Sequence, residues 1–181
     1  MSTAIIPFAG AYEIDRTHSS VQFAVKHIVS TFRASFDEIE GRLVGGDTGT
    51  TLTASARVES VSIVDPPEFR EHVVRGDDFF AADVHPELTF RSTGVELRDD
   101  GSAVVEGELT VRGITRPVTA EGSYRAPTQD PFGTVRAALA LHASVDRRDW
   151  GLSWQLPLPD GGDAVGWEVE LTAELELVEA V

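Results

Sequence analysis

The sequence contains no cysteine and no asparagine. Without cysteine the chain forms no disulfide, thiolate nucleophile, iron–sulfur cluster or Cys-ligated zinc site. The lack of cysteine does not identify the cellular compartment, because a cysteine-free chain tolerates either redox state. Without asparagine, glycine and aspartate supply the turn positions that need a positive φ.

Basic residues are scarce as well. The chain of 181 residues has 30 Asp and Glu against 15 Lys and Arg, a net charge of −15. Binding to nucleic acid and charge-driven docking on anionic lipid both need a basic face, so neither is expected. The 41% of hydrophobic residues is too high for a disordered chain. The length suits one domain with a buried core.

Long hydrophobic runs are also missing. No stretch approaches the roughly 18 apolar residues of a transmembrane helix, so no integral membrane segment is expected. A secretory signal needs a basic start and a longer apolar segment than Ala4–Phe8, and the first basic residue is Arg16. The chain as given is therefore expected to be cytoplasmic.

Motifs for catalysis and cofactor binding are absent too. The sequence has no G-x-S-x-G elbow, Walker loop or dinucleotide fingerprint. Asp77 and Asp78 are adjacent, so they point to opposite sides of an extended chain and do not suit a paired acid and base. The five histidines show no H-x-x-x-H spacing. We expect no catalytic residue, no metal site and no cofactor.

What the sequence does have is alternation of apolar and polar residues. On the last strand, apolar side chains from Trp167 to Leu177 share one face and glutamates share the other, which indicates a half-buried antiparallel strand. The other predicted strands are 12–15, 21–26, 36–44, 52–58, 88–93, 105–111, 118–125 and 135–145. Turns are expected at 45–47, 100–101 and 160–162.

One helix is predicted near residues 66–76. Asp65 can cap it, Pro66 or Pro67 can open it, and Gly76 can end it. About eight antiparallel strands with one covering helix indicate an all-β sandwich or closed barrel.

Strand length and small residues favour a barrel with a cavity. The last strand is much longer than a typical strand. The expected inward positions include many small residues, which leave room for a long, narrow, apolar bore: Ala54, Ala56, Gly107, Ala120, Ala137, Ala143 and Ala173. A two-sheet sandwich, with these residues packed under larger neighbours, remains the alternative.

Four segments have unusual composition: Tyr12–His27, Asp78–Phe90, Gly107–Val118 and Asp146–Gly151. In this order they resemble the YceI-like family of polyisoprenoid-binding proteins, from about Tyr12 to Val178. The resemblance makes 1–11 an N-terminal extension and 12–178 a single domain. It implies an extended antiparallel eight-stranded lipocalin-like β-barrel with a short capping helix. It also implies a hydrophobic tunnel for a long isoprenoid or similar amphiphilic lipid.

The chain departs from the family pattern at four positions. Tyr12 stands where tryptophan is common, and Ala34 and Ala81 stand where glycine and an acidic residue are usual. Trp167 stands where a smaller polar residue is usual. If Trp167 points inward, it shortens or plugs the bore.

The candidate ligand-binding residues in the tunnel or at its mouth are Phe23, Val25, His27, Phe79, Phe80, Leu109, Leu139, Leu141, Trp150 and Trp167. The head-group candidates are His18, Arg75, Arg112 and Arg147, because a diphosphate needs arginine or backbone N–H groups. Each candidate also has a structural alternative. His18 can belong to a turn network with Asp15, the arginines can pair with surface carboxylates, and the aromatic residues can be core.

Three functions follow from these observations. The first is binding of a polyisoprenoid or isoprenoid quinone-like lipid, as a carrier, storage or sequestration protein. The second is an enzyme acting on such a lipid, for which His27 is the candidate residue. The third is a self-filled structural or interaction barrel. All three functions are compatible with a homodimer.

Overall fold

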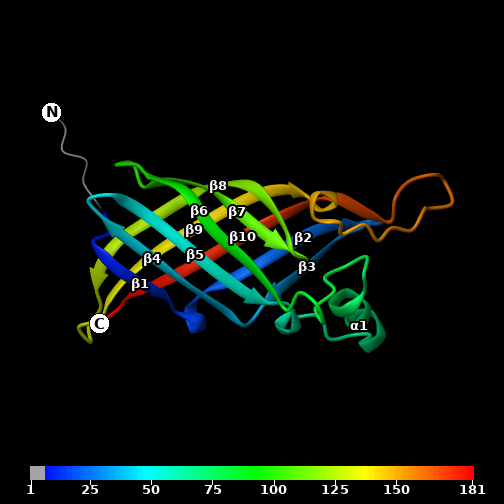
Figure 1. Cartoon of the computed structure of the whole chain (residues 1–181), viewed down its shortest axis with the longest axis horizontal. Helices are drawn as coiled ribbons and strands as arrows, with labels where there is room; N and C mark the ends of the chain where they lie inside the picture. Colours follow the sequence, from blue (N-terminus) through cyan, green and yellow to red (C-terminus); the bar gives the residue numbers. More distant parts are fainter. Residues whose placement is uncertain (1–6) are drawn as a thin grey trace.

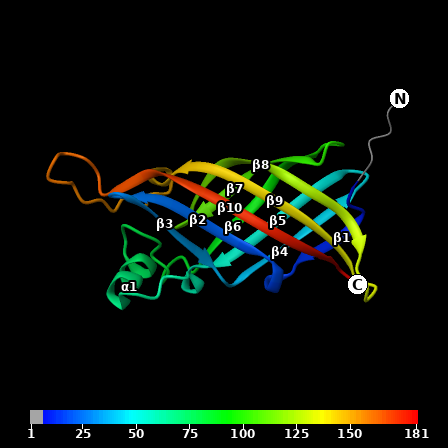
Figure 2. The same ribbon diagram turned by 180° about the vertical axis from the view of Figure 1, so that it is seen from behind.

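The computed structural model describes residues 7–181, which form an elongated barrel with one helix at one end (Figures 1 and 2). Most of the run Ala4–Phe8, on which the expected lack of a signal was argued, lies outside the described residues, as does much of the N-terminal extension. Among the described residues, no helix has the length and apolar character needed to span a bilayer.

Ten strands, one α-helix and three 3-10 turns make up the fold. The strands are β1 (Gly10–Ile14), β2 (Ser20–His27), β3 (Ser30–Phe36), β4 (Ile39–Gly46), β5 (Gly49–Arg57), β6 (Glu87–Leu97), β7 (Ser102–Val111), β8 (Ile114–Gln129), β9 (Val135–Asp146) and β10 (Val165–Glu179). The helix is α1 (Pro67–Arg75), and the turns are η1 (Arg16–His18), η2 (Val58–Ser60) and η3 (Arg147–Trp150).

The sheet closes on itself. Its strands follow the antiparallel order β1-β4-β5-β6-β7-β8-β9-β10, and β10 also pairs with β1. The strand β2 of the hairpin β2–β3 also pairs with β10. The strands β1 and β2, which η1 separates, therefore share one position in the barrel. The strands β3 and β4, which a break at 37–38 separates, share the next position. Ten strands thus fill eight positions. The predicted all-β eight-stranded barrel is confirmed, and the sandwich alternative is wrong.

Side-chain alternation explains the strands. In β10, Leu175 and Leu177 are buried while Glu174 is exposed and Glu176 is half-buried, as the period of two predicts. The segment β3 was missed in the sequence, although Phe32, Ala34 and Phe36 follow the same alternation. Its polar partners are small or basic, and they weaken the contrast between its two faces.

The helix lies in the segment 58–86, which connects β5 to β6 and covers one end of the barrel (Figure 1). The predicted helix agrees with the observed one to within a residue at each end. Its N-cap is Pro66 and no side chain caps it, so the expected capping by Asp65 is wrong. Val73 and Val74 are buried and face the barrel.

The core divides into two clusters along the barrel axis. The cluster at the end away from α1 is filled by large side chains that are fully buried, including Phe8, Leu43, Val105, Leu139 and Leu177. The other cluster lies under α1 and includes Phe36, Phe80 and Trp150. We call these the closed end and the α1 end. The expected bore therefore does not run through the whole barrel.

Candidate functional site

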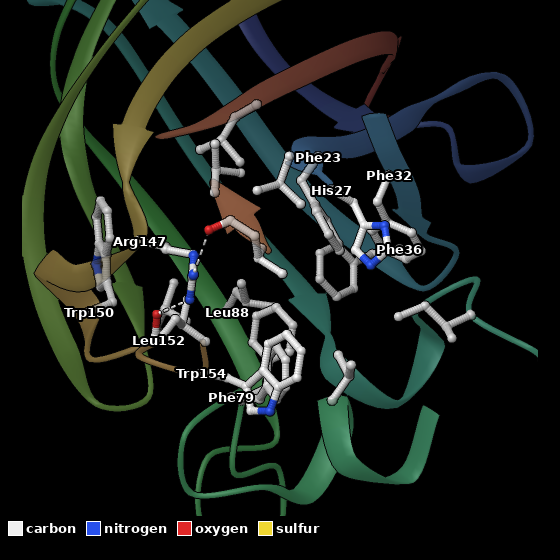
Figure 3. Close-up of a pocket in the computed structure, with 18 of the residues that line it drawn as sticks. Phe23, His27, Phe32, Phe36, Phe79, Leu88, Arg147, Trp150, Leu152 and Trp154 are labelled. Atoms are coloured by element: carbon white, nitrogen blue, oxygen red, sulfur yellow. Dashed lines mark hydrogen bonds between the residues drawn. The ribbon is translucent and has the colours of Figure 1, made fainter. Parts of the chain in front are cut away.

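An apolar cavity of about 520 Å³ lies at the α1 end (Figure 3). Of its 23 lining residues, 20 are apolar, and the polar ones are His27, Asp65 and Arg147. The apolar residues are Phe23, Val25, Phe32, Phe36, Ile63, Pro66, Phe69, Val73, Phe79, Phe80, Leu88, Leu109, Val111, Val145, Trp150, Leu152, Trp154, Val165, Val169 and Leu171. The volume falls in the range of roughly 300–1,000 Å³ that is usual for small-molecule sites.

Strand alternation aims much of this lining inward. On β2, Phe23, Val25 and His27 share the cavity face, as predicted from the sequence. On β10, Val169 and Leu171 do the same beside them, in register with Val25 and Phe23. Two neighbouring antiparallel strands therefore provide one continuous apolar wall.

Aromatic rings complete this wall. The ring centroid of Phe36 lies 5.8 Å from that of Phe23 and 5.9 Å from that of Phe80, and Phe32 lies 6.2 Å from Phe23. These separations are typical of edge-on and tilted aromatic contacts. Figure 3 shows Phe23, Phe32 and Phe36 together on one side, with Arg147 and Trp150 across the cavity.

Phe79 and Phe80 contribute differently although they are adjacent. Phe80 is buried in the core against Phe36. The Phe79 ring stacks on Trp154 at a centroid distance of 5.6 Å and an interplanar angle of 24°. The His72 ring packs at nearly a right angle to the Phe79 ring, with the two centroids 5.0 Å apart. Both phenylalanines line the cavity, and Phe79 links the helix segment to the loop that carries Trp154.

Arg112 and Trp150 hold the covering loops on the barrel. The Trp150 indole N–H donates a hydrogen bond of 3.0 Å to the Leu109 carbonyl. The Arg112 guanidinium donates to the carbonyls of Trp150 at 3.2 Å, Gly151 at 2.5 Å and Asp77. One arginine at the β7–β8 turn thereby fixes both the chain after η3 and the chain after α1.

Arg147 is the one buried charged residue of the described chain, with 6% of its surface exposed. Its guanidinium donates to the carbonyls of Gly166 at 2.8 Å, Leu152 at 2.6 Å and Val165 at 3.4 Å. It also lies 4.1 Å from the ring centroid of Trp167. Burial lowers the pKa of Arg147 from its ordinary value. Backbone carbonyls and an aromatic face contact this charge directly, and the carboxylates of Asp146 and Asp163 stabilise it from a greater distance.

The structure does not bring the four head-group candidates together. His18 bonds Asp15 at the closed end. Arg75 pairs with Glu59, Glu71 and Asp83 on the outer side of α1. Arg112 and Arg147 donate to backbone carbonyls as described. Only Arg147 lines the cavity.

Three of the candidate tunnel residues also lie outside the cavity. Leu139 and Leu141 are buried in the closed-end cluster. Trp167 contacts Arg147 and donates from its indole nitrogen to Asp163 at 3.1 Å. The register of β10 shifts between Val165 and Val169, so the side chain of Trp167 does not follow the inward alternation of the strand. Trp167 does not line the cavity and does not plug it.

Several lining residues were missed from the sequence. Phe32 lies on the unpredicted strand β3. Phe69 and Val73 lie on one face of α1 at a spacing of four, a signal within the predicted helix that could have identified them. Leu152 and Trp154 lie in an irregular loop, where no periodicity reveals which side chains turn inward.

One cluster of potential metal ligands occurs in the described part of the chain. Ligand atoms of Asp15, His18 and Glu176 lie within 4.8 Å of one another at the closed end. The Arg136 guanidinium donates to Asp15 at 3.0 Å and to Glu176 at 2.7 Å. Arg136 also donates to Asp130 at 2.9 Å, so one guanidinium bridges three carboxylates. We therefore interpret the cluster as an ion-pair network that joins η1 and its cap Asp15 to β9 and β10.

Comparison with known proteins places this geometry in context. The chain is 31% identical over 183 residues to a UPF0312 protein of Yersinia pestis, covering 99% of this chain and 92% of that one. It is 28% identical over 168 residues to a UPF0312 protein of Staphylococcus aureus, covering 91% and 95%.

Solved structures share the fold. The chain matches BcnA of Burkholderia cenocepacia with a TM-score of 0.70 at 18% identity, covering 90% of this chain and 98% of that one. It matches a polyisoprenoid binding domain from Saccharophagus degradans with a TM-score of 0.68 at 15% identity, covering 93% and 98%. The YceI-like domain family matches residues 12–177. The chain therefore belongs to the YceI-like domain family.

Proposed function

We propose that this protein binds the hydrocarbon chain of an isoprenoid lipid in the cavity at the α1 end. The observation behind the proposal is a cavity of about 520 Å³ with 20 apolar lining residues out of 23. Such a cavity favours an apolar ligand because binding removes apolar surface from water on both sides. The structural neighbour described as a polyisoprenoid binding domain supports an isoprenoid as the ligand class.

The filled closed end limits the length of chain that can enter. Leu88 lines the cavity, whereas Phe90, two residues further on the same face of β6, packs against the closed-end cluster. We infer that Phe90 forms the floor of the site. A short isoprenoid chain fits above this floor, and a long one must fold back or extend out of the mouth.

The polar groups at the site suit an uncharged head group. A diphosphate needs several converging donors. Of the four candidates, His18, Arg75 and Arg112 lie elsewhere, and the Arg147 guanidinium already donates to three carbonyls. The other polar lining residues are His27 and Asp65. A hydroxyl or quinone oxygen can exchange a hydrogen bond with either of them, whereas Asp65 repels an anion.

Binding, for carriage or storage, is better supported than catalysis. A general acid or base works best when a second group orients it. Within residues 7–181, the His27 ring has no hydrogen-bond partner and no ion pair. A barrel filled by its own side chains describes the closed end, but the α1 end contains the cavity.

The first experiment identifies the ligand directly. The protein is purified under native conditions, extracted with organic solvent and analysed by mass spectrometry beside a heat-denatured sample and an unrelated protein. We expect a specifically enriched neutral isoprenoid at close to one per protein. A protein that comes out empty and also refuses added isoprenoids contradicts the proposal.

The second experiment tests the site. Trp150 and Trp154 line the cavity, so intrinsic fluorescence should report the entry of geranylgeraniol. Val145→Phe adds bulk inside the cavity and should weaken binding at least tenfold, about 1.4 kcal/mol. Val44→Phe is the matched control, because Val44 is exposed on β4. Geranylgeranyl diphosphate should bind more weakly than the alcohol.

A further inference from the structure

Three segments that line the cavity continue directly into exposed aliphatic residues. Ile28 and Val29 follow the lining residue His27, Val64 precedes Asp65, and Leu156 lies two residues after Trp154. The exposed fractions are 96% for Val29, 75% for Val64, 56% for Ile28 and 54% for Leu156. We call these four residues the mouth rim. Figure 1 shows the β2–β3 hairpin, the loop before β10 and α1 gathered at the same end of the molecule.

Backbone hydrogen bonds hold two parts of this rim side by side. The Ile28 N–H donates to the Ala164 carbonyl at 2.8 Å, and the Ala164 N–H donates to the Leu156 carbonyl at 2.9 Å. The tip of the β2–β3 hairpin and the β9–β10 loop are thus tied through one residue. The exposed aliphatic residues of the two segments therefore lie next to each other at the mouth of the cavity.

Turn chemistry does not explain the apolar tip. His27 pairs with Ser30, so Ile28 and Val29 are the two central residues of a tight hairpin. Ile28 has φ of 48°, a conformation that β-branched residues adopt with strain. Asn-Gly or Asp-Gly is favoured in such a turn. The hairpin therefore carries an exposed Ile-Val pair at a cost to its own stability.

We propose that the mouth rim docks on the uncharged surface of a lipid bilayer, so that the ligand passes between bilayer and cavity without crossing water. This inference rests on the proposed function, because an isoprenoid is dissolved in membrane lipid. The rim is continuous with the apolar cavity, which is the route that such a transfer needs. Exposed aliphatic side chains beside a binding site are typical of an interaction surface.

A bilayer fits the rim better than a protein partner does. Four aliphatic side chains from three segments expose much less area than the roughly 800 Å² that each partner buries in a stable protein interface. Charge selects the kind of bilayer. The rim segments carry Asp65, Asp160 and Asp163 against the single lysine Lys26, and the net charge of the chain is −15. An anionic surface repels such a protein, whereas a zwitterionic surface does not.

Flotation with vesicles tests the docking. The wild type should float with phosphatidylcholine vesicles, and adding phosphatidylglycerol at low salt should weaken the association. Ile28→Asn with Val29→Gly installs a favourable turn and removes the apolar tip, so the fold should be retained. This double variant should lose at least about tenfold in partitioning, because two aliphatic side chains no longer leave water. Phe132→Ser is the matched control, since Phe132 is 93% exposed in the β8–β9 loop, outside the rim.

A parallel measurement separates this inference from the proposed function. Geranylgeraniol uptake is measured without vesicles, and the double variant should bind it as the wild type does. Failure of the wild type to float with phosphatidylcholine vesicles overturns the docking even if geranylgeraniol binds. Equal flotation of the wild type and the double variant overturns it as well. So does a wild-type dimer that the double variant lacks, because the rim is then a contact between two copies.

Discussion

The ring of Phe90 on β6 lies in the space that a side chain on Gly107 of β7 would occupy. A Cβ at position 107 would clash with this ring and lie 2.6 Å from the Arg91 carbonyl oxygen. The small residue and the large one are thus a complementary pair across neighbouring strands. Together they fill the barrel interior beside the closed-end cluster.

Gly107→Ala should destabilise the fold by about 1–3 kcal/mol, since overpacking a filled core costs this much. Urea unfolding measures the change. Gly94→Ala is the control, because the nearest atom to a Cβ at Gly94 is a Glu106 carboxylate oxygen at 3.5 Å. If the two substitutions cost the same, the contact between Phe90 and Gly107 is not what constrains position 107.

Phe90→Ala should open the floor of the site and change ligand choice. Phe90 is half-buried, so its truncation should cost less than the about 3–5 kcal/mol lost when a fully buried phenylalanine is removed. The space gained should raise the affinity for a longer prenol relative to geranylgeraniol, measured by tryptophan fluorescence. Phe132→Ala removes an exposed ring and should leave the ratio unchanged. A ratio that Phe90→Ala also leaves unchanged would show that Phe90 is not the floor.

Arg147→Gln should loosen the loop between β9 and β10. Three backbone carbonyls lose their guanidinium donor, and a buried acceptor without a partner costs roughly 1–3 kcal/mol. Hydrogen exchange should rise at Leu152 and Gly166, and geranylgeraniol should bind more weakly. Arg148→Gln is the neighbouring control. Arg148 also lies over the Trp167 ring, at 4.9 Å from its centroid, but it is exposed and its side chain bonds to Asp146 rather than to backbone carbonyls. Equal effects of the two substitutions would count against a special role for Arg147.

The ion-pair network at the closed end should make stability depend on pH through His18. The hydrogen bond to Asp15 raises the pKa of His18 above its ordinary value, and the bond to His18 lowers the pKa of Asp15. The contribution of His18 is therefore full below its ordinary pKa of 6.5 and is lost as the pH rises through the raised value. The contribution of Asp15 is present above its ordinary pKa of 3.8 and is lost as the pH falls through the lowered value.

Unfolding of the wild type and His18→Gln should consequently differ most below the ordinary His18 pKa of 6.5 and converge as the pH rises through the raised pKa of His18. Urea midpoints at each pH measure the difference. Parallel pH profiles would show that His18 takes no part in the network when it is charged.

Much of the site could be predicted from alternation alone. The predicted inward orientation of side chains on β2 and β7 was correct for Phe23, Val25, His27 and Leu109. Alternation failed at Trp167, because the shift in register within β10 cannot be read from one strand. It also failed for Leu139 and Leu141, which point inward but at the filled level of the barrel.

The sequence by itself determined the class of fold and the apolar character of the interior, because period-two alternation and turn residues are local properties of the chain. Only the tertiary structure decided where the interior is empty. A small residue such as Gly107 leaves space on its own strand, but Phe90 from the neighbouring strand fills it. The extent of a cavity depends on which side chains meet across strands, and that register is set by packing of the whole barrel.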